Sequence, residues 1–272
     1  MIRPLIHAFS EAARAVQVAD DFPSRARLAS DFIFSRGLKA SWWPGRNRGR
    51  TVQWRGCTVH YRFNRGDVQG FREVFMDECY LTPGVARPRT ILDLGANVGL
   101  ASVWLWRTYQ PEYLLAVEPD PDNAAVAQRN FTANHIPGQV VPAAVGARSG
   151  TAWLHRQAAS NIGTMQRTPD SSESSTAIEV NVKAIDELLD MLPGGQADLV
   201  KMDIEGGEGD LLAAPCTWLT RVGALLVEFH DEKTPSAPLI AAVEAHGFTH
   251  RRINATRQDN LSAFVRDGGH SL

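Results

Sequence analysis

The sequence contains few cysteines and no long apolar segment. Cys57, Cys79 and Cys216 are odd in number, widely spaced and free of any CxxC pattern, so they indicate neither a disulfide framework nor a metal finger. No apolar run approaches the roughly 18 residues that a membrane-spanning helix needs. The N-terminus lacks the uninterrupted apolar core of a secretory signal. These absences favour a reduced, cytoplasmic protein without a membrane partner.

The chain also lacks an excess of charge of one sign. Its 272 residues are 44% hydrophobic and 21% charged, with a formal net charge of -2, which is ordinary for a globular protein. Dedicated nucleic-acid-binding proteins usually carry a clear basic excess. Trp42 and Trp43 beside Arg46, Arg48 and Arg50 are a candidate for base stacking, but one short basic loop is usually solvated surface. We therefore expect no nucleic-acid partner.

From Thr90 onward, short apolar runs alternate with helical patterns. The runs that predict strands are TILDLG, EYLLAVEP, QVVPAAVG, DLVKMDIEG and VGALLVEFH, followed by FTHRRI and NLSAFVR as a final hairpin at the sheet edge. GTAWLHR predicts one further edge strand. Strands alternating with helices in this way are typical of βαβ units in a parallel sheet covered on both faces. We expect a doubly wound, Rossmann-like α/β fold.

The first 85 residues do not follow this alternation and form an N-terminal segment, which we separate from a main domain at residues 86–272. Ser10 to Ala19 has a helical pattern, and TVQWRGCTVHYRF alternates like a hairpin with its turn near Arg55-Gly56. VQGFREVFMDECY predicts an amphipathic helix that leads toward the sheet. The N-terminal segment is expected to be a helical and hairpin cap.

The first predicted strand ends in the glycine-containing turn of ILDLGANVGL. In an open parallel sheet, ligands bind beyond the carboxyl ends of the strands. Gly95 and Gly99 follow that end, where glycine lets a ligand lie against bare backbone. Glu118 ends the second strand, where a carboxylate can accept both hydroxyl protons of a ribose. The pair indicates an adenosine-containing cofactor.

The spacing of the turn distinguishes between two such cofactors. The dinucleotide fingerprint GxGxxG is absent. The acid-x-G-x-G-x-G pattern of class I S-adenosylmethionine enzymes fits if Asn97 takes the middle position, and asparagine tolerates a left-handed backbone well. The carboxylate of Asp93 attracts an ammonium or a sulfonium and repels a pyrophosphate. The turn therefore predicts an S-adenosylmethionine site, with a tight turn and a chance acid as the alternative.

ILDLGANVGLAS, AVEPD, DLVKMDIEGGEGDLL and LLVEFHDE, in that order and spacing, resemble the FkbM family of methyltransferases. The resemblance covers about Val68 to Arg266, and Gly207 stands where alanine is common. It implies a class I fold of seven strands with the last antiparallel, and methyl transfer usually to oxygen, here a hydroxyl of a sugar or another secondary metabolite. Enzymes of this kind are commonly dimers, so a homodimer is a further expectation.

The resemblance also implies a role for each residue that matches a motif. The residues expected at the carboxypropyl-amine end of the cofactor are Asp93, Gly95, Ala96, Asn97 and Gly99. Glu118 would bind the ribose, bordered by Pro119 and Asp120. Ala144 and Val145 would lie near the adenine ring, unless they only pack a strand end.

The two central strands end in charged residues. Side-chain alternation predicts that Lys201, Asp203 and Glu205 share one side, as do Glu228 and His230. Methyl transfer is an in-line displacement that depends on positioning, and a hydroxyl acceptor also needs a proton acceptor nearby. We expect Asp203 at the cofactor's amino group or methyl region, His230 as the leading general base, and Glu205 and Glu228 to orient His230 or bind substrate.

Other interpretations of these charges remain open. Lys201 with Asp203 or Glu228 can be a structural ion pair, and Glu205 and Glu208 can simply favour the amino end of the next helix.

Alternatively, Asp203, Glu205 and His230 ligate a divalent cation that binds an acceptor diol.

The polar, serine-rich stretch from Ala158 to Thr176 is a long loop for a compact domain. Asn161 and Thr164 are expected to hydrogen-bond the acceptor there, and the stretch is expected to close as a lid; an ordinary connection is the alternative.

Two other functions stay open for the whole chain. A nicotinamide-dependent oxidoreductase would bind NAD(H), and a non-catalytic scaffold would keep the fold without turnover.

Overall fold

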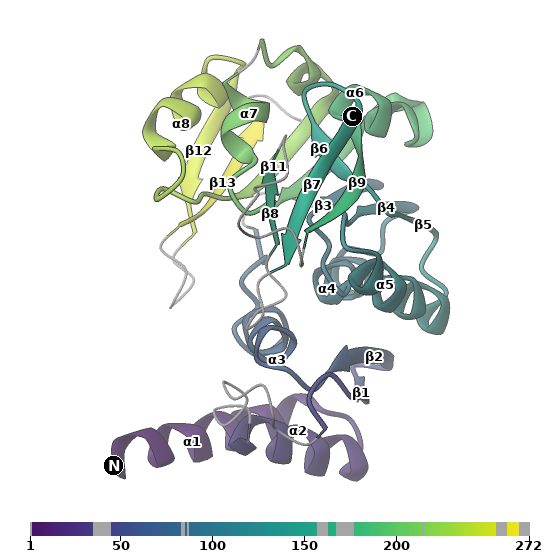
Figure 1. The fold of residues 1–272 in the computed structure, drawn as a ribbon, viewed down its shortest axis with the longest axis vertical. Coiled ribbons are helices and arrows are strands. Elements are labelled where there is room, and N and C mark those ends of the chain that lie inside the picture. The colour runs from purple at the N-terminus through teal and green to yellow at the C-terminus, as the bar shows by residue number, and fades with distance from the viewer. Residues whose placement is uncertain are drawn as a thin grey trace.

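The computed structural model describes residues 2–34, 45–82, 85, 87–156, 163–166, 177–213, 215–253 and 260–266. Its centre is a seven-stranded sheet in the order β12-β13-β11-β10-β3-β4-β5 (Figure 1). The strands are β3 (Thr90–Leu94), β4 (Tyr113–Val117), β5 (Gly138–Val141), β10 (Ala197–Met202), β11 (Val222–Glu228), β12 (Phe248–Arg252) and β13 (Leu261–Arg266).

The last strand, β13, runs antiparallel to both of its neighbours, and the other pairs in the sheet are parallel. The prediction of seven strands with the last antiparallel is therefore confirmed. The predicted hairpin forms, but β13 enters the sheet between β11 and β12, so β12 takes the edge. The strand order reverses at β3, where ligands bind in folds of this type.

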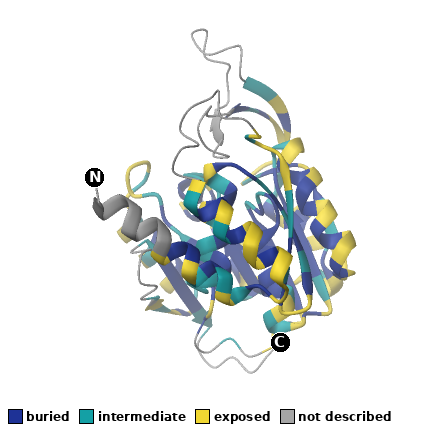
Figure 2. Cartoon of the chain, turned by 90° about the horizontal axis from the view of Figure 1, so that it is seen from below, coloured by how far each residue is buried: buried dark blue, intermediate teal, exposed yellow. Residues whose placement is uncertain are grey.

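Helices cover both faces of the sheet. They are α4 (Leu100–Tyr109), α5 (Pro121–Asn134), α6 (Ile185–Asp190), α7 (Glu208–Leu212) and α8 (Ser236–Glu244). Neighbouring residues of one strand enter different hydrophobic clusters, as Ile91 and Leu92 or Leu114 and Leu115 do, because side chains alternate across a strand. Figure 2 shows buried strands beneath helices whose outer surfaces are exposed. The predicted doubly wound fold is confirmed.

A second sheet of four strands, in the order β6-β9-β7-β8, corrects two predictions. Its strands are β6 (Ala144–Gly146), β7 (Gly150–Arg156), β8 (Gly163–Gln166) and β9 (Ala177–Ala184). QVVPAAVG is not one strand, because it divides at Pro142 into β5 and β6, and proline cannot donate to a ladder. GTAWLHR is β7 and pairs with β9 and β8 rather than with the main sheet.

The N-terminal segment contains α1 (Ile2–Val18), α2 (Phe22–Phe34), β1 (Gly49–Trp54), β2 (Cys57–Arg62), α3 (Arg65–Phe71) and the π-helix η2 (Arg72–Met76). It lies below α4 and α5 in Figure 1. The predicted hairpin turn is confirmed, since Arg55 and Gly56 have φ values of 47° and 78°. The predicted helix toward Tyr80 ends earlier, at Met76.

The N-terminal segment shares a hydrophobic cluster with one face of the sheet. Trp54 and Phe75 have ring centroids 4.7 Å apart, and both belong to the cluster that contains Trp104 of α4 and Ile91 of β3. A domain boundary between residues 85 and 86 stays a prediction.

Within the described ranges, no helix combines the length and the hydropathy that crossing a membrane requires.

Candidate active site

The glycine turn between β3 and α4 has three residues in the left-handed region. The φ values are 73° at Gly95, 50° at Asn97 and 79° at Gly99. A Cβ on Gly95 would lie 1.8 Å from the carbonyl oxygen of Asp203, so the turn is pressed against the end of β10. The sequence argument that Asn97 can take the place of glycine in a left-handed position agrees with the structure.

The buried side chain of Lys201 holds this turn in place. Nζ of Lys201 donates to the carbonyl oxygens of Gly95 at 2.8 Å and Leu94 at 3.3 Å. It also lies 3.2 Å from Oδ1 of Asp93 and 3.8 Å from Oδ2 of Asp203. Burial alone would lower the pKa of Lys201, but the two carboxylates outweigh it and raise the pKa. Lys201 is therefore in an ion pair, chiefly with Asp93.

The two aspartates beside Lys201 differ in access. Asp93 is fully buried and accepts a 2.6 Å hydrogen bond from Oγ of Ser102. The side chain of Asp203 is 26% exposed. The ammonium group of a ligand would thus meet Asp203 first. The contact of Asp93 with a cofactor amine stays a prediction.

Glu118 lies on the other side of the turn, at the end of β4. Its Oε2 accepts from the backbone N–H of Asn97 at 2.8 Å, and its Oε1 from the N–H of Asp120 at 2.9 Å and Nδ2 of Asn123 at 3.3 Å. Burial raises the pKa of Glu118 to about 7, against the lowering effect of these hydrogen bonds. A carboxylate offers about four acceptor positions, so three donors leave room for a ribose hydroxyl.

The residues predicted to border the adenosine have the following places. Asp120 is the N-cap of α5 and accepts from the N–H of Asp122 at 2.8 Å, and Pro119 precedes it. Ala144 is buried and Val145 half-buried on β6, which follows the carboxyl end of β5. Contacts of these residues with a cofactor stay predictions.

The residues predicted to bind the acceptor are only partly within the described structure. The backbone of Thr164 lies on β8. Asn161 lies outside the described residues, as do Trp42 and Trp43.

His230, just past β11, lies between two glutamates. Its Nδ1 is 3.1 Å from Oε1 of Glu208, and its Nε2 is 3.4 Å from Oε2 of Glu205. Burial alone would lower the pKa of His230, but the hydrogen bond and charge of Glu208, followed by Glu205 and Asp203, raise it to about 9. Glu208 also accepts from the N–H of Ile204 at 3.1 Å in the first turn of α7, so it has the helix role considered for it as well.

Side-chain alternation is not what brings these groups together. β10 ends at Met202 and β11 at Glu228, so Asp203, Glu205 and His230 lie beyond the strands and the alternation argument for them is wrong. The chain turns instead through positive φ values of 55° at Glu205 and 96° at Gly206. The predicted grouping is nevertheless present.

Among the described residues, Asp203, Glu228 and His230 could together hold a metal ion, because each offers a ligand atom within 4.8 Å of the others. This set has Glu228 where the sequence argument used Glu205. Burial, followed by the charge of Asp203, raises the pKa of Glu228 to about 8. Nδ2 of Asn260 donates to Glu228 at 3.1 Å.

Sequence reasoning missed the residues that hold the carboxylates in place. Ser102, Asn123 and Asn260 each donate to a carboxylate of the site. Asn123 carried a signal, because it lies in the first turn of the helix that follows Glu118. Asn260 comes from the turn before β13, 32 residues along the chain from Glu228, and no local pattern indicates it.

Comparisons with known proteins point to one family. A family model described as the methyltransferase FkbM domain matches residues 93–256. The 31-O-demethyl-FK506 methyltransferase FkbM of Streptomyces tacrolimicus is 26% identical over 229 residues, covering 71% of this chain and 86% of that protein. Methyltransferase 1 of Beauveria bassiana is 25% identical over 197 residues, covering 65% and 79%. The crystal structure of a methyltransferase from Pyrococcus furiosus has a TM-score of 0.48 at 9% identity, covering 89% of this chain and 98% of that one.

Proposed function

The chain belongs to the methyltransferase FkbM domain family, and we propose that it transfers the methyl group of S-adenosylmethionine to a hydroxyl oxygen of a small molecule, such as a sugar or another secondary metabolite. The observation that carries this proposal is the set of acidic groups around the glycine turn. Among the residues that the structure describes around the turn, Asp93, Glu118 and Asp203 outnumber the ammonium of Lys201. Such surroundings suit a cationic ligand, whereas a pyrophosphate favours a helix amino end free of carboxylates.

The residues of the site divide the work of such a reaction. When bound, S-adenosylmethionine supplies an electrophilic methyl group, so that a C–O bond to the acceptor forms as the C–S bond breaks and its electron pair stays on sulfur. In this proposal Glu118 holds a ribose hydroxyl and Asp203 faces the cofactor's ammonium. His230 takes the proton of the acceptor hydroxyl, and Glu205 and Glu228 orient His230 or the acceptor. Oxygen as the acceptor is supported by the name of the Streptomyces tacrolimicus relative, which specifies an O-demethyl substrate.

Calorimetric titration of the purified protein tests the cofactor directly. We expect binding of S-adenosylmethionine and none of NAD(H), because the third glycine of the dinucleotide fingerprint is missing. Absence of binding at high micromolar S-adenosylmethionine would overturn the proposal. Binding without methyl transfer to any hydroxyl compound would instead favour a scaffold. A homodimer stays a prediction, which sedimentation would test.

The affinity for S-adenosylmethionine should depend on pH through Glu118. Its pKa, raised from 4.5 to about 7, means that the carboxylate predominates only above that pH, so affinity should fall as pH drops from 8 to 6. Glu118→Gln has the same shape but one oxygen acceptor, and it should bind about tenfold more weakly at pH 8, as expected for losing one charge-assisted hydrogen bond. Calorimetry at three pH values checks this. A variant with the wild-type pH dependence would contradict the assignment.

A divalent cation is a second candidate for the acceptor side of the site. Two carboxylates and an imidazole, from Asp203, Glu228 and His230, form a suitable donor set. The imidazole must be neutral to bind a metal, so binding would release a proton. Titration with Mg²⁺ in two buffers of different ionisation enthalpy tests this. Heat that depends on the buffer supports the cation, and no heat at millimolar Mg²⁺ removes it from the proposal.

A further inference from the structure

A chain of polar contacts links the N-terminal segment to Glu118. The buried amide of Asn123 donates to Oε1 of Glu118 at 3.3 Å and accepts from Nη2 of Arg62 at 2.6 Å. Arg62 is the last residue of β2. A hairpin that precedes the methyltransferase motifs in the sequence therefore reaches the carboxylate assigned to the ribose.

The chemistry of the three groups fixes the orientation of the amide. Arginine only donates hydrogen bonds, and an ionised carboxylate only accepts them. The oxygen of Asn123 must therefore face Arg62, and its NH₂ group must face Glu118. Without the guanidinium, the amide can turn over and present its oxygen to Glu118, where it would repel the carboxylate. Arg62 thus ensures that Asn123 turns its NH₂ group, rather than its oxygen, toward Glu118.

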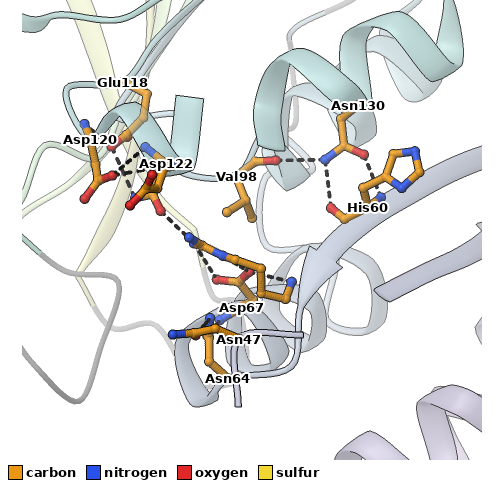
Figure 3. A network of polar contacts seen from close by, with 11 residues as sticks. Asn47, His60, Asn64, Asp67, Val98, Glu118, Asp120, Asp122 and Asn130 are labelled. Carbon is orange, nitrogen blue, oxygen red and sulfur yellow. Dashed lines mark hydrogen bonds and ion pairs between the residues drawn. The ribbon is translucent and has the colours of Figure 1, made fainter. Parts of the chain in front are cut away.

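Arg62 is itself held rigidly. Its backbone N–H and its Nε donate to Oδ2 of Asp67 at 2.7 and 3.0 Å, and the Asp67 side chain is fully buried. Asp67 lies in the first turn of α3, which Asn64 caps through the N–H of Asp67. Figure 3 shows Asp67 and Asn64 together below the turn that carries Val98. The guanidinium has little freedom to leave Asn123.

The strand that carries Arg62 is tied to α5 by two further asparagines. Asn130 accepts from the N–H of His60 at 2.7 Å and donates to its carbonyl oxygen at 2.9 Å. Asn134 makes the same pair of bonds to Thr58, both at 2.8 Å. Four helical residues rise about 6 Å and two strand residues about 6.6 Å, so the amides match the free edge of β2 in register.

Asn130 also connects this edge to the glycine turn. Its Nδ2 donates to the carbonyl oxygen of Val98 at 2.8 Å, and Figure 3 shows Asn130 between Val98 and His60. The hairpin is therefore positioned against the turn and against Glu118 at the same time.

We propose that Arg62 is a positioning residue for the cofactor, acting through Asn123 on the ribose-binding carboxylate of Glu118. This inference rests on the proposed function, since it requires S-adenosylmethionine at the glycine turn. The N-terminal segment then contributes to cofactor affinity without touching the cofactor.

The test measures the dissociation constant of S-adenosylmethionine by calorimetry. Arg62→Met combined with Asp67→Asn removes the guanidinium without leaving a buried charge unpaired. We expect about tenfold weaker binding, the size of one hydrogen bond to a charged group. Asn123→Leu, which keeps the Arg62–Asp67 pair, should weaken binding by a similar factor.

A matched control is available in the same hairpin. Arg50 and Asp31 form a pair with Nε–Oδ2 at 3.0 Å and similar burial, and it has no contact with Glu118 among the described interactions. Arg50→Met with Asp31→Asn should leave the dissociation constant unchanged even if it lowers the melting temperature.

The Glu118→Gln background separates positioning from general destabilisation. There the Arg62 and Asp67 replacements should change affinity little, because interacting residues give non-additive effects. An equal loss in both backgrounds, or a dissociation constant like that of the control pair, would overturn the inference. If the wild-type protein does not bind S-adenosylmethionine at all, the proposed function fails first, and the two failures are thereby distinguished.

Discussion

Alanine in place of Gly95 should abolish binding of S-adenosylmethionine and destabilise the fold. The new Cβ would lie 1.8 Å from the carbonyl oxygen of Asp203. The backbone fixes the positions of both atoms, so no rotamer change relieves the contact. The left-handed backbone alone costs about 1–2 kcal/mol for a residue other than glycine. The clash adds to this, and relieving it must move the turn away from β10. Urea unfolding and calorimetry measure the two effects.

Gly56 provides the control for this substitution. Its φ of 78° is close to the 73° of Gly95, but a Cβ there would meet nothing within 4 Å. Gly56→Ala should therefore lose only the backbone contribution, about 1–2 kcal/mol, and keep its cofactor affinity. Equal stabilities of the two variants, with normal binding by both, would show that the turn is not pressed against β10 as described.

The second large effect is expected at His230. His230→Gln keeps a hydrogen-bond donor for Glu208 but cannot take up a proton, so the rate of methyl transfer should fall by about 10²–10⁴-fold. The fold and the affinity for S-adenosylmethionine should be retained. Transfer of labelled methyl groups to an acceptor hydroxyl measures the rate. A variant with the wild-type rate would exclude His230 as the base and leave Glu228 as the candidate.

The pH dependence gives a sharper form of this test. Because the pKa of His230 is raised from 6.5 to about 9, the neutral imidazole becomes more abundant as pH increases, and the wild-type rate should rise with pH up to about that value. Glu208 supplies the largest raising effect. Glu208→Gln should therefore move the rise in rate to lower pH, and NMR titration of the imidazole should report the same shift. The ion pair of His230 with Glu208 stabilises the folded protein fully below pH 6.5, and this stabilisation is lost as pH rises through 9.

The seven-stranded sheet could be predicted because its central strands are short and almost wholly buried. All five residues of β3, Thr90–Leu94, are buried, so the run is continuous and its glycine turn is unambiguous. β9 shows the opposite case. Only Val180 is buried among its eight residues, so neither continuous burial nor alternation marks it, and its partner β7 was assigned to the wrong sheet.

The site could be predicted as a set of residues but not as a network. The motifs locate Glu118, Asp203 and His230, since each follows the end of a central strand. They do not indicate that His230 pairs with Glu208, because a glutamate in the first turn of a helix has a sufficient local explanation. The link from Arg62 to Asn123 spans 61 residues, and contacts of that range leave no periodic signal.

The hydrogen bonds of Asn130 and Asn134 to the edge of β2 have a consequence for biosynthesis. The amides that close the hairpin's edge lie 70 and 76 residues further along the chain than their backbone partners. The ribosome therefore releases the hairpin well before α5 exists to receive it. Until then the outer edge of β2 lacks its amide partners, although Trp54 and Phe71 can already pack on Phe75 within the segment, so docking of the hairpin on α5 is expected to be a late event in maturation.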